Sequence, residues 1–372
     1  ISCNRVYRHG LTRTKKRHSS LTLMADNNPV LSLLPVQAGL LRHLSLSLPD
    51  MGLDLDTLLE REGYTSSLWL DNQQEVPALL LENLLSHCLN ETGDELFGFH
   101  LAQRVRPEGF GVLGYIRQAC QNLQDFILLC IRYEHLLSGF GKTGLQKEPG
   151  RCVWSWSAYT LNPTFERHAS EFILAAFSTT RSLLKDPQCP WLTEVRFTHS
   201  APQTMAARKE VEAYFGCRVR YNQKHNGLVM PVETLSQPFN SADPGLMHSL
   251  EQHAQSLEAS RTVKGFYYRA YKITREQILS RQASKENLAS ALGISSRHLH
   301  RQLSRENINY RALHEQVMLT LAIEYLSTSD RTIENIAMAL GYTESQSFIR
   351  WFKKQTGQTP SRYRDISLSR KP

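Results

Sequence analysis

The sequence predicts a multidomain protein, with an α+β N-terminal domain followed by an all-α C-terminal domain that holds two helix-turn-helix units. Three observations support this prediction. The chain has 372 residues, which is enough for two domains of ordinary size. Its N-terminal part mixes helical and strand patterns without the regular βα alternation of a doubly wound sheet. Near the C-terminus, a pattern of helix, glycine and helix occurs twice.

Charge is distributed unevenly along the chain, and the distribution is more informative than the net charge of +8. Residues 259–372 carry 19 Lys and Arg against nine Asp and Glu, whereas residues 24–258 carry 18 against 26. The first 23 residues have six cations and no acid. A basic C-terminal domain behind an acidic one indicates a polyanionic partner for that end of the chain.

Composition argues against several classes of protein. With 41% apolar and 21% charged residues the chain resembles ordinary globular proteins, and no apolar run approaches the roughly 18 residues of a membrane span. The seven cysteines are an odd number and include no Cys-x-x-Cys pair, which favours reduced thiols over disulfides or a zinc site. We therefore expect a cytoplasmic protein with no metal, no other cofactor and no membrane partner.

Residues 1–28 are expected to be a disordered extension. "ISCNRVYRHGLTRTKKRHSS" is basic, has no apolar periodicity and lacks the apolar segment of a secretory signal. Met24 would be a plausible start, so that residues 1–23 would be an artefact of start-site choice. The alternative is a basic arm that touches DNA.

The N-terminal domain is expected to span residues 29–250 and to combine helices with a small sheet. "GFGKTGLQ" and "RCVWSWSAY" alternate about Pro149 and Gly150, which predicts a β-hairpin. The remaining patterns predict helices near 30–43, 54–62, 76–90, 94–104, 111–122, 124–138, 163–184 and 202–216, and strands near 192–199, 217–222 and 226–231. A helical linker is expected over 251–264, followed by a C-terminal domain over 265–366.

The repeated unit of the C-terminal domain reads "LASALGISSRHLHRQL" over 288–303 and "IAMALGYTESQSFIRWF" over 336–352. In each copy a glycine, Gly293 or Gly341, suits the positive φ that ends a helix. Ser295 and Thr343 suit the N-cap of the next helix, and Thr343 with Gln346 matches a capping box. Each copy therefore predicts a helix-turn-helix whose second helix is a candidate recognition helix.

Helical periodicity separates an apolar face from a polar face on both candidate recognition helices. Leu299 and Leu303 in the first copy, and Phe348 and Phe352 in the second, repeat at i and i+4 and are expected to point inward. Arginine suits guanine, glutamine suits adenine and lysine suits phosphate, so the opposite faces fit double-stranded DNA. A solvated cationic face would explain one copy, but two copies with matching turns favour DNA.

A helix expected from about Tyr310 to Ser327 separates the two copies and is roughly 27 Å long. Adjacent major-groove segments on one face of B-DNA lie about 34 Å apart. A rod of this length could place a recognition helix in each of two adjacent grooves.

Residues 265–366 resemble the AraC/XylS-type DNA-binding domain of bacterial transcription regulators, most closely over "ALGYTESQSFIRWFKKQTGQTPSRYR". The resemblance implies a cytoplasmic transcription regulator, for example an activator, with seven helices in this domain and a promoter or operator as its partner. The implied base contacts are Arg297, His300, Arg301, Ser345, Gln346 and Arg350. The implied phosphate contacts are His298, Gln302, Lys353, Lys354, Arg362 and Arg364.

"FGVLGYIRQA", "EVRFTHSAPQ" and "YFGCRVRYNQKHNGLVMP" resemble the arabinose-binding-type effector domain that accompanies one branch of these regulators. The resemblance implies an unidentified small-molecule effector, a homodimer and RNA polymerase as partners. Trp154 and Trp156 share one face of their strand and, with His168, are the candidate effector-binding residues. The alternatives are that the two indoles pack under a helix and that His168 is a satisfied or exposed histidine.

No catalytic residues are predicted, and the protein is not expected to be an enzyme. The chain lacks Gly-x-Ser-x-Gly, His-Glu-x-x-His and a Gly-rich phosphate loop. Two alternatives to an effector-controlled regulator stay open: an architectural DNA-binding protein that needs no ligand, and an enzyme fused to a DNA-binding domain.

Overall fold

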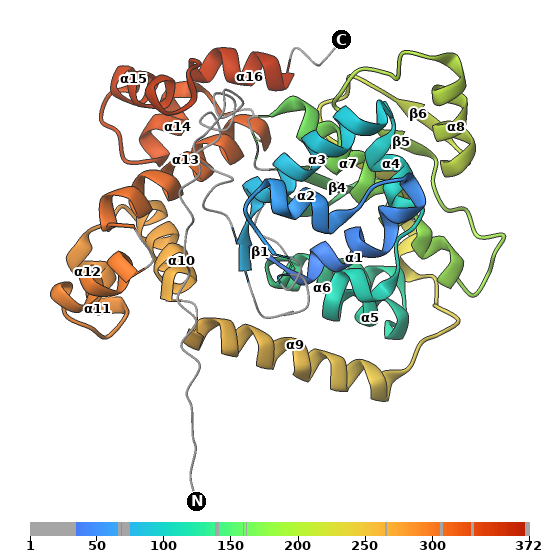
Figure 1. Ribbon diagram of the computed structural model, residues 1–372, viewed down its shortest axis with the longest axis horizontal. Coiled ribbons are helices and arrows are strands. Elements are labelled where there is room, and N and C mark those ends of the chain that lie inside the picture. Colours follow the sequence, from blue (N-terminus) through green and yellow to red (C-terminus); the bar gives the residue numbers. More distant parts are fainter. Residues whose placement is uncertain are drawn as a thin grey trace, which may run out of the picture.

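The computed structural model describes residues 35–65, 68, 75–137, 141–158, 160, 162–264, 266–305, 308–328 and 331–368. The expected extension over residues 1–28 lies outside the described residues. The described chain forms an N-terminal domain of helices and a sheet and an all-helical C-terminal domain, as the sequence predicts (Figure 1).

The helices of the N-terminal domain surround its sheet (Figure 1). The domain begins with a short antiparallel pair, β1 (Pro35–Gln37) with β2 (Glu75–Pro77). Its α-helices are α1 (Gly39–Ser47), α2 (Leu55–Arg61), α3 (Ala78–Thr92), α4 (Phe97–Ala102), α5 (Gly111–Ala119), α6 (Leu123–Tyr133), α7 (Pro163–Ser178) and α8 (Met205–Phe215). Short 3-10 helices include η4 (Pro107–Phe110), η5 (Glu134–Leu136), η6 (Thr179–Leu183) and η7 (Val232–Ser236).

The main sheet has five strands within the described residues, in the order β3-β4-β7-β5-β6. Only β5 and β6 pair in parallel; the other neighbours are antiparallel. The strands are β3 (Gly141–Glu148), β4 (Arg151–Ala158), β5 (Glu194–Arg196), β6 (Arg218–Arg220) and β7 (Gly227–Pro231). The predicted hairpin is confirmed as β3-β4. Trp154 of β4 stacks on Phe177 of α7 at 3.8 Å between ring centroids, so α7 covers this face of the sheet.

Two predicted helices have wrong boundaries. The helix expected near 30–43 begins only at Gly39, because residues 35–37 pair with β2 instead. The helix expected over 163–184 ends as an α-helix at Ser178 and continues as η6. The hydroxyl groups of Thr179 and Ser182 donate to backbone carbonyls three residues earlier, and such local bonds compete with a regular α-helix.

The C-terminal domain contains seven helices in its described part, the number that the family resemblance implies. A longer helix, α9 (Pro244–Lys264), connects the two domains along the lower edge in Figure 1, and the expected boundary at residue 250 falls inside it. The seven helices are α10 (Phe266–Leu279), α11 (Lys285–Ala291), α12 (Ser296–Arg305), α13 (Tyr310–Thr328), α14 (Ile333–Ala339), α15 (Ser345–Thr356) and α16 (Pro360–Leu368).

The two turns of the repeat differ in detail. Gly293 and Gly341 both take the predicted positive φ, 68° and 89°. Ser295 caps α12 by accepting the backbone N–H of His298 at 3.2 Å. The capping box predicted for the second copy is wrong, because α15 starts at Ser345 and its N-cap residue makes no side-chain bond. The second turn is one residue longer, which moves Thr343 away from the capping position.

The sequence also predicts reduced thiols and no membrane-spanning segment. The six cysteines among the described residues are all free. Within the same part of the chain, no helix has the length and apolar character required to cross a membrane.

Gly98→Ala is expected to destabilise the protein, because α4 packs against α7 through this glycine. A Cβ atom at Gly98 would lie 2.1 Å from the carbonyl oxygen of His168, so the two helices would have to separate. We expect a loss of about 1–3 kcal/mol in the free energy of unfolding, measured by urea denaturation. The control is Gly245→Ala, where the new Cβ would meet only Asp243 Oδ1 at 3.4 Å. Equal effects of the two substitutions would contradict this packing.

Candidate nucleic-acid interface and ligand cavity

The two candidate recognition helices, α12 and α15, are anchored by the apolar residues that periodicity predicts. Leu299 and Leu303 of α12 and Phe348 and Phe352 of α15 are all fully buried. Phe352 also meets Tyr363 of α16 edge to face, with ring centroids 5.6 Å apart. Because the apolar faces point into the domain, the opposite faces point outward. Both helices lie on the side of the C-terminal domain away from the main sheet (Figure 1).

Most of the predicted base-contacting side chains are exposed on these outer faces. Ser345 is half-buried, and the exposed residues are Arg297, His300, Arg301, Gln346 and Arg350. The described part of the chain offers no ion-pair partner to Arg297, Arg301 or Arg350, so their charges face solvent.

The predicted phosphate-contacting residues divide into two groups. Lys353, Lys354 and Arg362 are exposed. His298 and Gln302 are half-buried and lie 3.0 Å apart through Nε2 of each side chain. Arg364 is also half-buried, and its Nε and Nη2 atoms are enclosed without a hydrogen-bond acceptor. The first group is therefore free to meet a phosphate as it stands, and the second would have to rearrange.

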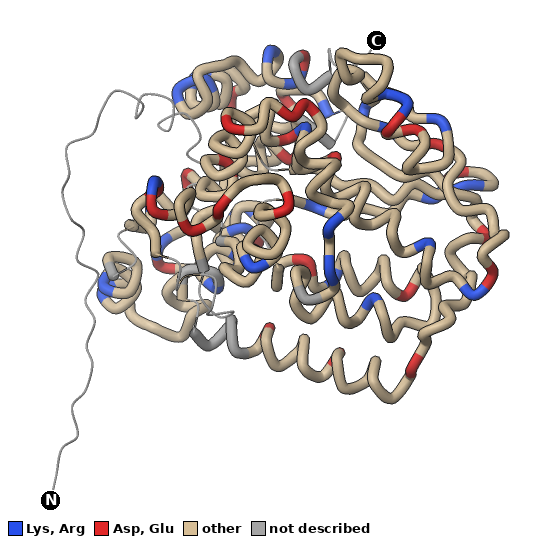
Figure 2. Tube along the Cα trace, turned by 45° about the vertical axis from the view of Figure 1, so that its right-hand side comes forward, with Lys and Arg blue, Asp and Glu red and all other residues tan. Residues whose placement is uncertain are grey.

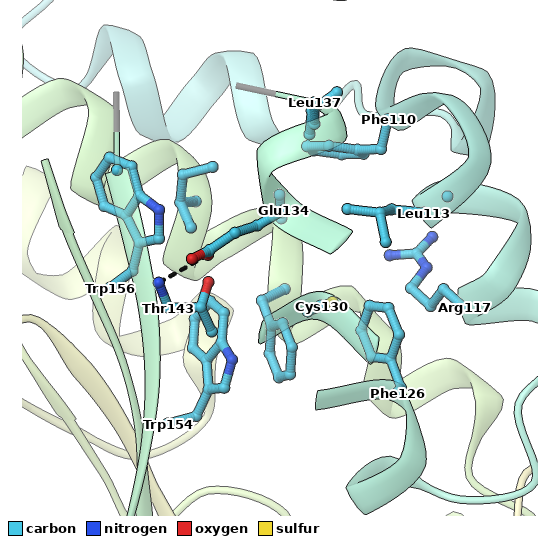
Figure 3. A pocket seen from close by; sticks show the side chains of 15 residues that line it. Phe110, Leu113, Arg117, Phe126, Cys130, Glu134, Leu137, Thr143, Trp154 and Trp156 are labelled. Atoms are coloured by element: carbon cyan, nitrogen blue, oxygen red, sulfur yellow. Dashed lines mark hydrogen bonds between the residues drawn. The ribbon is translucent and has the colours of Figure 1, made fainter. Parts of the chain in front are cut away.

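The N-terminal domain contains a cavity of about 110 Å³ beside the β3-β4 hairpin. Trp154 and Trp156, two of the predicted effector residues, both line it (Figure 3). The remaining walls are mainly apolar and come from η4, α5, α6, η5 with the residue after it, β3 and α7. They include Phe110, Leu113, Phe126, Cys130, Leu137, Ile173 and Phe177.

Two charged side chains, Arg117 of α5 and Glu134 of η5, also line this cavity. Glu134 Oε2 accepts the backbone N–H of Thr143 at 2.7 Å, as Figure 3 shows. Burial raises the pKa of Glu134 to about 7, even though the bonds to Thr143 and the charge of Lys142 oppose the shift. Arg117 donates to Thr179 Oγ1 at 2.7 Å, and burial lowers its pKa. Arg117 lies in the segment "FGVLGYIRQA" that resembles the effector domain, but its neighbours there assign it no role, and Glu134 lies in no motif.

His168, the third predicted effector residue, lies outside the lining of this cavity. Its Nδ1 accepts the backbone N–H of Gly98 at 3.3 Å and lies 3.4 Å from Glu171 Oε2. Glu171 also pairs with Arg167 at 3.0 Å, and His199 Nε2 lies 3.4 Å from its Oε1. Burial lowers the pKa of His199 to about 4. This buried polar cluster joins α4, α7 and the segment after β5.

Glu324 of α13 connects the two domains. Its carboxylate accepts hydrogen bonds from Lys142 of β3 and, at 2.9 Å, from Arg275 Nη2 of α10. Burial alone would raise the pKa of Glu324, but the bond from Lys142 and the charge of Arg275 outweigh burial and lower it. A second contact joins the domains where Tyr363 Oη donates to the carbonyl oxygen of Thr160 at 3.3 Å.

The connecting helix α9 is held against the N-terminal domain by ion pairs on its surface. Glu251 pairs with Arg132 of α6 at 3.1 Å, and Glu258 pairs with His135 of η5 at 3.3 Å. Figure 2 shows acidic positions in red along α9, the long helix at the lower edge of the view. Because α6 and η5 also line the cavity, α9 rests directly on two of its walls.

Strand β3 takes part in both the cavity and the contact between domains. Gly141 and Thr143 line the cavity, and Lys142 between them reaches Glu324. Successive side chains of a strand point to opposite faces, which explains how neighbouring residues serve both. The strand that borders the cavity therefore also provides the lysine that pairs with α13.

These observations agree with the comparisons to known families. A family model described as "Arabinose-binding domain of AraC transcription regulator, N-term" matches residues 52–239, and one described as "Helix-turn-helix domain" matches residues 288–366. The chain therefore belongs to the AraC family of DNA-binding transcription regulators with an arabinose-binding-type N-terminal domain.

Individual relatives are named as transcription regulators. The chain is 29% identical to the ornithine utilization regulator of Pseudomonas aeruginosa over 278 residues, which cover 73% of this chain and 79% of the relative. It is 22% identical to the regulator VqsM of the same species over 275 residues, covering 72% and 83%. The crystal structure of the regulator CdpR from Pseudomonas aeruginosa is 20% identical and covers 83% of this chain and 96% of that chain, with a TM-score of 0.40.

The cavity contains the polar groups through which a ligand could be held. In the described part of the chain, no group of three or more His, Cys, Asp or Glu side chains is arranged to hold a metal ion. The chemistry that remains is ion pairing by Arg117 and Glu134, stacking on the indoles and hydrogen bonding to Trp154 Nε1, which is buried without an acceptor.

Glu134→Gln is expected to stabilise the protein more at pH 8 than at pH 4.5. A carboxyl whose pKa rises from 4.5 to about 7 on folding binds its proton more tightly in the folded state. The free energy of unfolding therefore falls as the pH rises through this range, and the glutamine variant lacks this loss. We expect the difference between variant and parent to grow by about 1–3 kcal/mol between the two pH values in urea denaturation.

Glu60→Gln, at an exposed position of α2, is the control for this measurement. A Glu134→Gln difference that stays constant with pH, or grows no more than the control, would contradict the buried environment described for Glu134.

Proposed function

We propose that this protein controls transcription by binding a promoter with both helix-turn-helix units, and that a small molecule in the N-terminal cavity modulates this binding. The base contacts in this proposal are Arg297, His300, Arg301, Ser345, Gln346 and Arg350. The phosphate contacts are Lys353, Lys354 and Arg362, joined by His298, Gln302 and Arg364 after rearrangement. In this proposal the protein binds as a homodimer, as the family resemblance implies, and acts on RNA polymerase.

The observation that carries effector control is the double role of β3. An architectural DNA-binding protein has no need for a cavity whose wall continues into the DNA-binding domain. Here a ligand that displaces Trp156 or Thr143 shifts the strand that bears Lys142, and Lys142 holds the buried Glu324 of α13. Because α13 separates the two helix-turn-helix units, a small displacement of this helix changes how both recognition helices meet DNA.

The proposal is tested first by finding the DNA site. Sequences selected from a random duplex library by the purified protein give the operator, and their binding is then measured with small molecules added. The proposal requires a selected sequence and at least one compound that changes the affinity for it. A protein that selects no sequence would contradict specific DNA binding, and one whose affinity no compound changes would be an architectural DNA-binding protein.

Arg301→Ala and Arg350→Ala are each expected to weaken binding to the selected sequence by about 1–3 kcal/mol and to relax preference at one or two base pairs. Each guanidinium is exposed and forms no ion pair in the described part of the chain. It can bind guanine through two hydrogen bonds. The measurement is a fluorescence anisotropy titration with matched and mismatched duplexes. The control is Arg311→Ala on α13, an exposed arginine that pairs with Glu315 at 3.0 Å. Unchanged affinity in both recognition-helix variants would contradict the assignment.

Lys142→Met is expected to loosen the contact between domains without unfolding either one. Glu324 then loses one of its two cationic partners, and a buried carboxylate with fewer partners favours arrangements that admit water. Backbone amides of α13 and β3 should exchange faster with deuterated solvent. Lys147→Met, at an exposed position of the same strand, is the matched control. Equal exchange rates in the two variants would contradict a role for this ion pair in communication.

A further inference from the structure

The cavity beside β3 holds two charges of opposite sign that are not paired. Arg117 gives one hydrogen bond to Thr179, while its Nε is buried without an acceptor. Among the described residues, no carboxylate lies within 4.0 Å of its guanidinium. Arg117 is half-buried, and the groups of the described chain next to its charge are neutral, which is an unusual environment for an arginine.

Glu134 is in the complementary situation on another wall. It accepts the backbone N–H of Thr143, and no cation of the described chain forms an ion pair with it. Lys142 is close enough to influence it but is engaged by Glu324. Figure 3 shows the Glu134 carboxylate turned toward Thr143 and Trp156, whereas Arg117 reaches in from the α5 side beyond Leu113. The two charged groups therefore approach one cavity from different sides.

A third polar group in the wall also lacks a partner. Trp154 Nε1 is buried and has no acceptor, although buried indole N–H groups usually find one. Unpaired buried charges and donors destabilise a protein, and apolar residues in their place often stabilise it. Two half-buried charges and one buried donor around one aromatic cavity indicate that the partners come from a bound molecule.

We propose that this cavity binds a small zwitterion, whose carboxylate pairs with Arg117, whose ammonium group pairs with Glu134, and whose apolar body lies against the aromatic walls. A ligand with one charge would leave the other charge of the cavity unpaired. The indoles of Trp154 and Trp156 add attraction for the ammonium group, because a cation is stabilised over an aromatic face. This proposal rests on the effector control proposed above and names the class of effector.

The size of the cavity limits the ligand to a small molecule. A cavity of about 110 Å³ is comparable to engineered protein cavities of roughly 150 Å³ that bind benzene. Amino acids with a short side chain, or short straight-chain amino acids with the amine at the far end, are closest to this range, and an amino acid with a single-ring side chain tests its upper limit. A neutral sugar could form hydrogen bonds with Arg117 and Glu134 but would compensate neither charge.

The first experiment needs no ligand. If the partner of Arg117 is a ligand carboxylate, Arg117→Met removes a half-buried charge that forms no ion pair in the described chain, and is expected to raise Tm by about 2–6 °C. Arg167→Met is the matched control, because Arg167 is also largely buried but pairs with Glu171 at 3.0 Å, and its loss should lower Tm. A lower Tm for Arg117→Met would assign this residue a structural role and overturn the proposal.

The second experiment measures binding of matched probes by isothermal titration calorimetry. One series is 5-aminopentanoate, pentylamine and pentanoate; the other is L-phenylalanine, 2-phenylethylamine and 3-phenylpropanoate. We expect at least one zwitterion to bind tenfold or more tightly than both of its single-charge analogues. The advantage should disappear in Arg117→Met and in Glu134→Gln. A single-charge analogue that binds as tightly as its zwitterion, or binding of neither zwitterion, would overturn the proposal.

The pH dependence of binding adds a readout that a structural role of Glu134 would not produce. The charged or titratable groups around Glu134 are Lys142 of β3, Cys130 of α6 and Arg117 of α5, while His135 on its own helix pairs with Glu258. Burial raises the pKa of Cys130 well above its usual value, so this thiol keeps its proton. Ammonium binding requires the ionised carboxylate, and the affinity for the zwitterion should rise between pH 6 and 8 as Glu134, with a pKa of about 7, loses its proton. A falling affinity would indicate an anionic ligand and contradict the proposal.

The same titrations separate this proposal from effector control in general. Binding of a zwitterion that leaves DNA affinity unchanged would support the ligand class and contradict effector control. A response of DNA affinity to neutral or singly charged compounds alone would support effector control and overturn the ligand class.

Discussion

The register between β3 and β4 determines which side chains of β3 face the cavity. Both the cavity and the contact between the domains depend on this register. Thr143 lies opposite Trp156, and Gly141 lies beneath the same indole, where a Cβ atom would come within 2.2 Å of the ring. This close contact fixes which residues of β3 face the cavity. Because side chains alternate along a strand, Lys142 must then point to the other face, where Glu324 receives it. A slip of one residue would exchange the two roles.

The contacts between the domains differ in strength for an electrostatic reason. Glu324 is buried, so losing either cationic partner leaves a poorly solvated charge, which is strongly unfavourable. The pairs that hold α9 are more exposed and are weakened by water and salt. The orientation of α13 is therefore set mainly by β3 and α10, and α9 serves as a less constrained connection. This arrangement is consistent with the effector control proposed above.

Local patterns explain why parts of this structure could be predicted. Leu299, Leu303, Phe348 and Phe352 are buried as their spacing indicates, because a helix of fixed pitch needs only one face against the core. The inward orientation of Trp154 follows in the same way from the period of a strand. The predicted positions of helix ends agree less well with the structure. Hydrogen bonds of individual hydroxyl groups decide the boundary after Ser178, and a turn that is one residue longer decides where α15 begins.

The candidate ligand site shows the limit of such patterns. Trp156 could be predicted as a wall residue from the period of its strand. Arg117 lies in a segment that resembles the effector domain and Glu134 lies in none, but the neighbours of either residue along the chain do not show that it faces a cavity. His168 was selected for its chemistry, yet packing of α4 against α7 directs it into a separate polar cluster. A charged residue is a candidate for ligand binding when several elements pack around it and none of them offers an ion-pair partner. The sequence next to the residue does not show which elements these are.

The two candidate recognition helices, their cationic faces and the rod between them follow from the sequence alone, because these features depend on residues within a few helical turns of one another. The cavity, with charges that form no ion pair in the described chain, and the contact that joins it to the DNA-binding domain arise only when distant segments pack together. Lys142 and Glu324 are 182 positions apart, and no local propensity brings them together. They come together because the sheet and the helices pack against one another. This packing depends on burial and charge pairing over the whole chain.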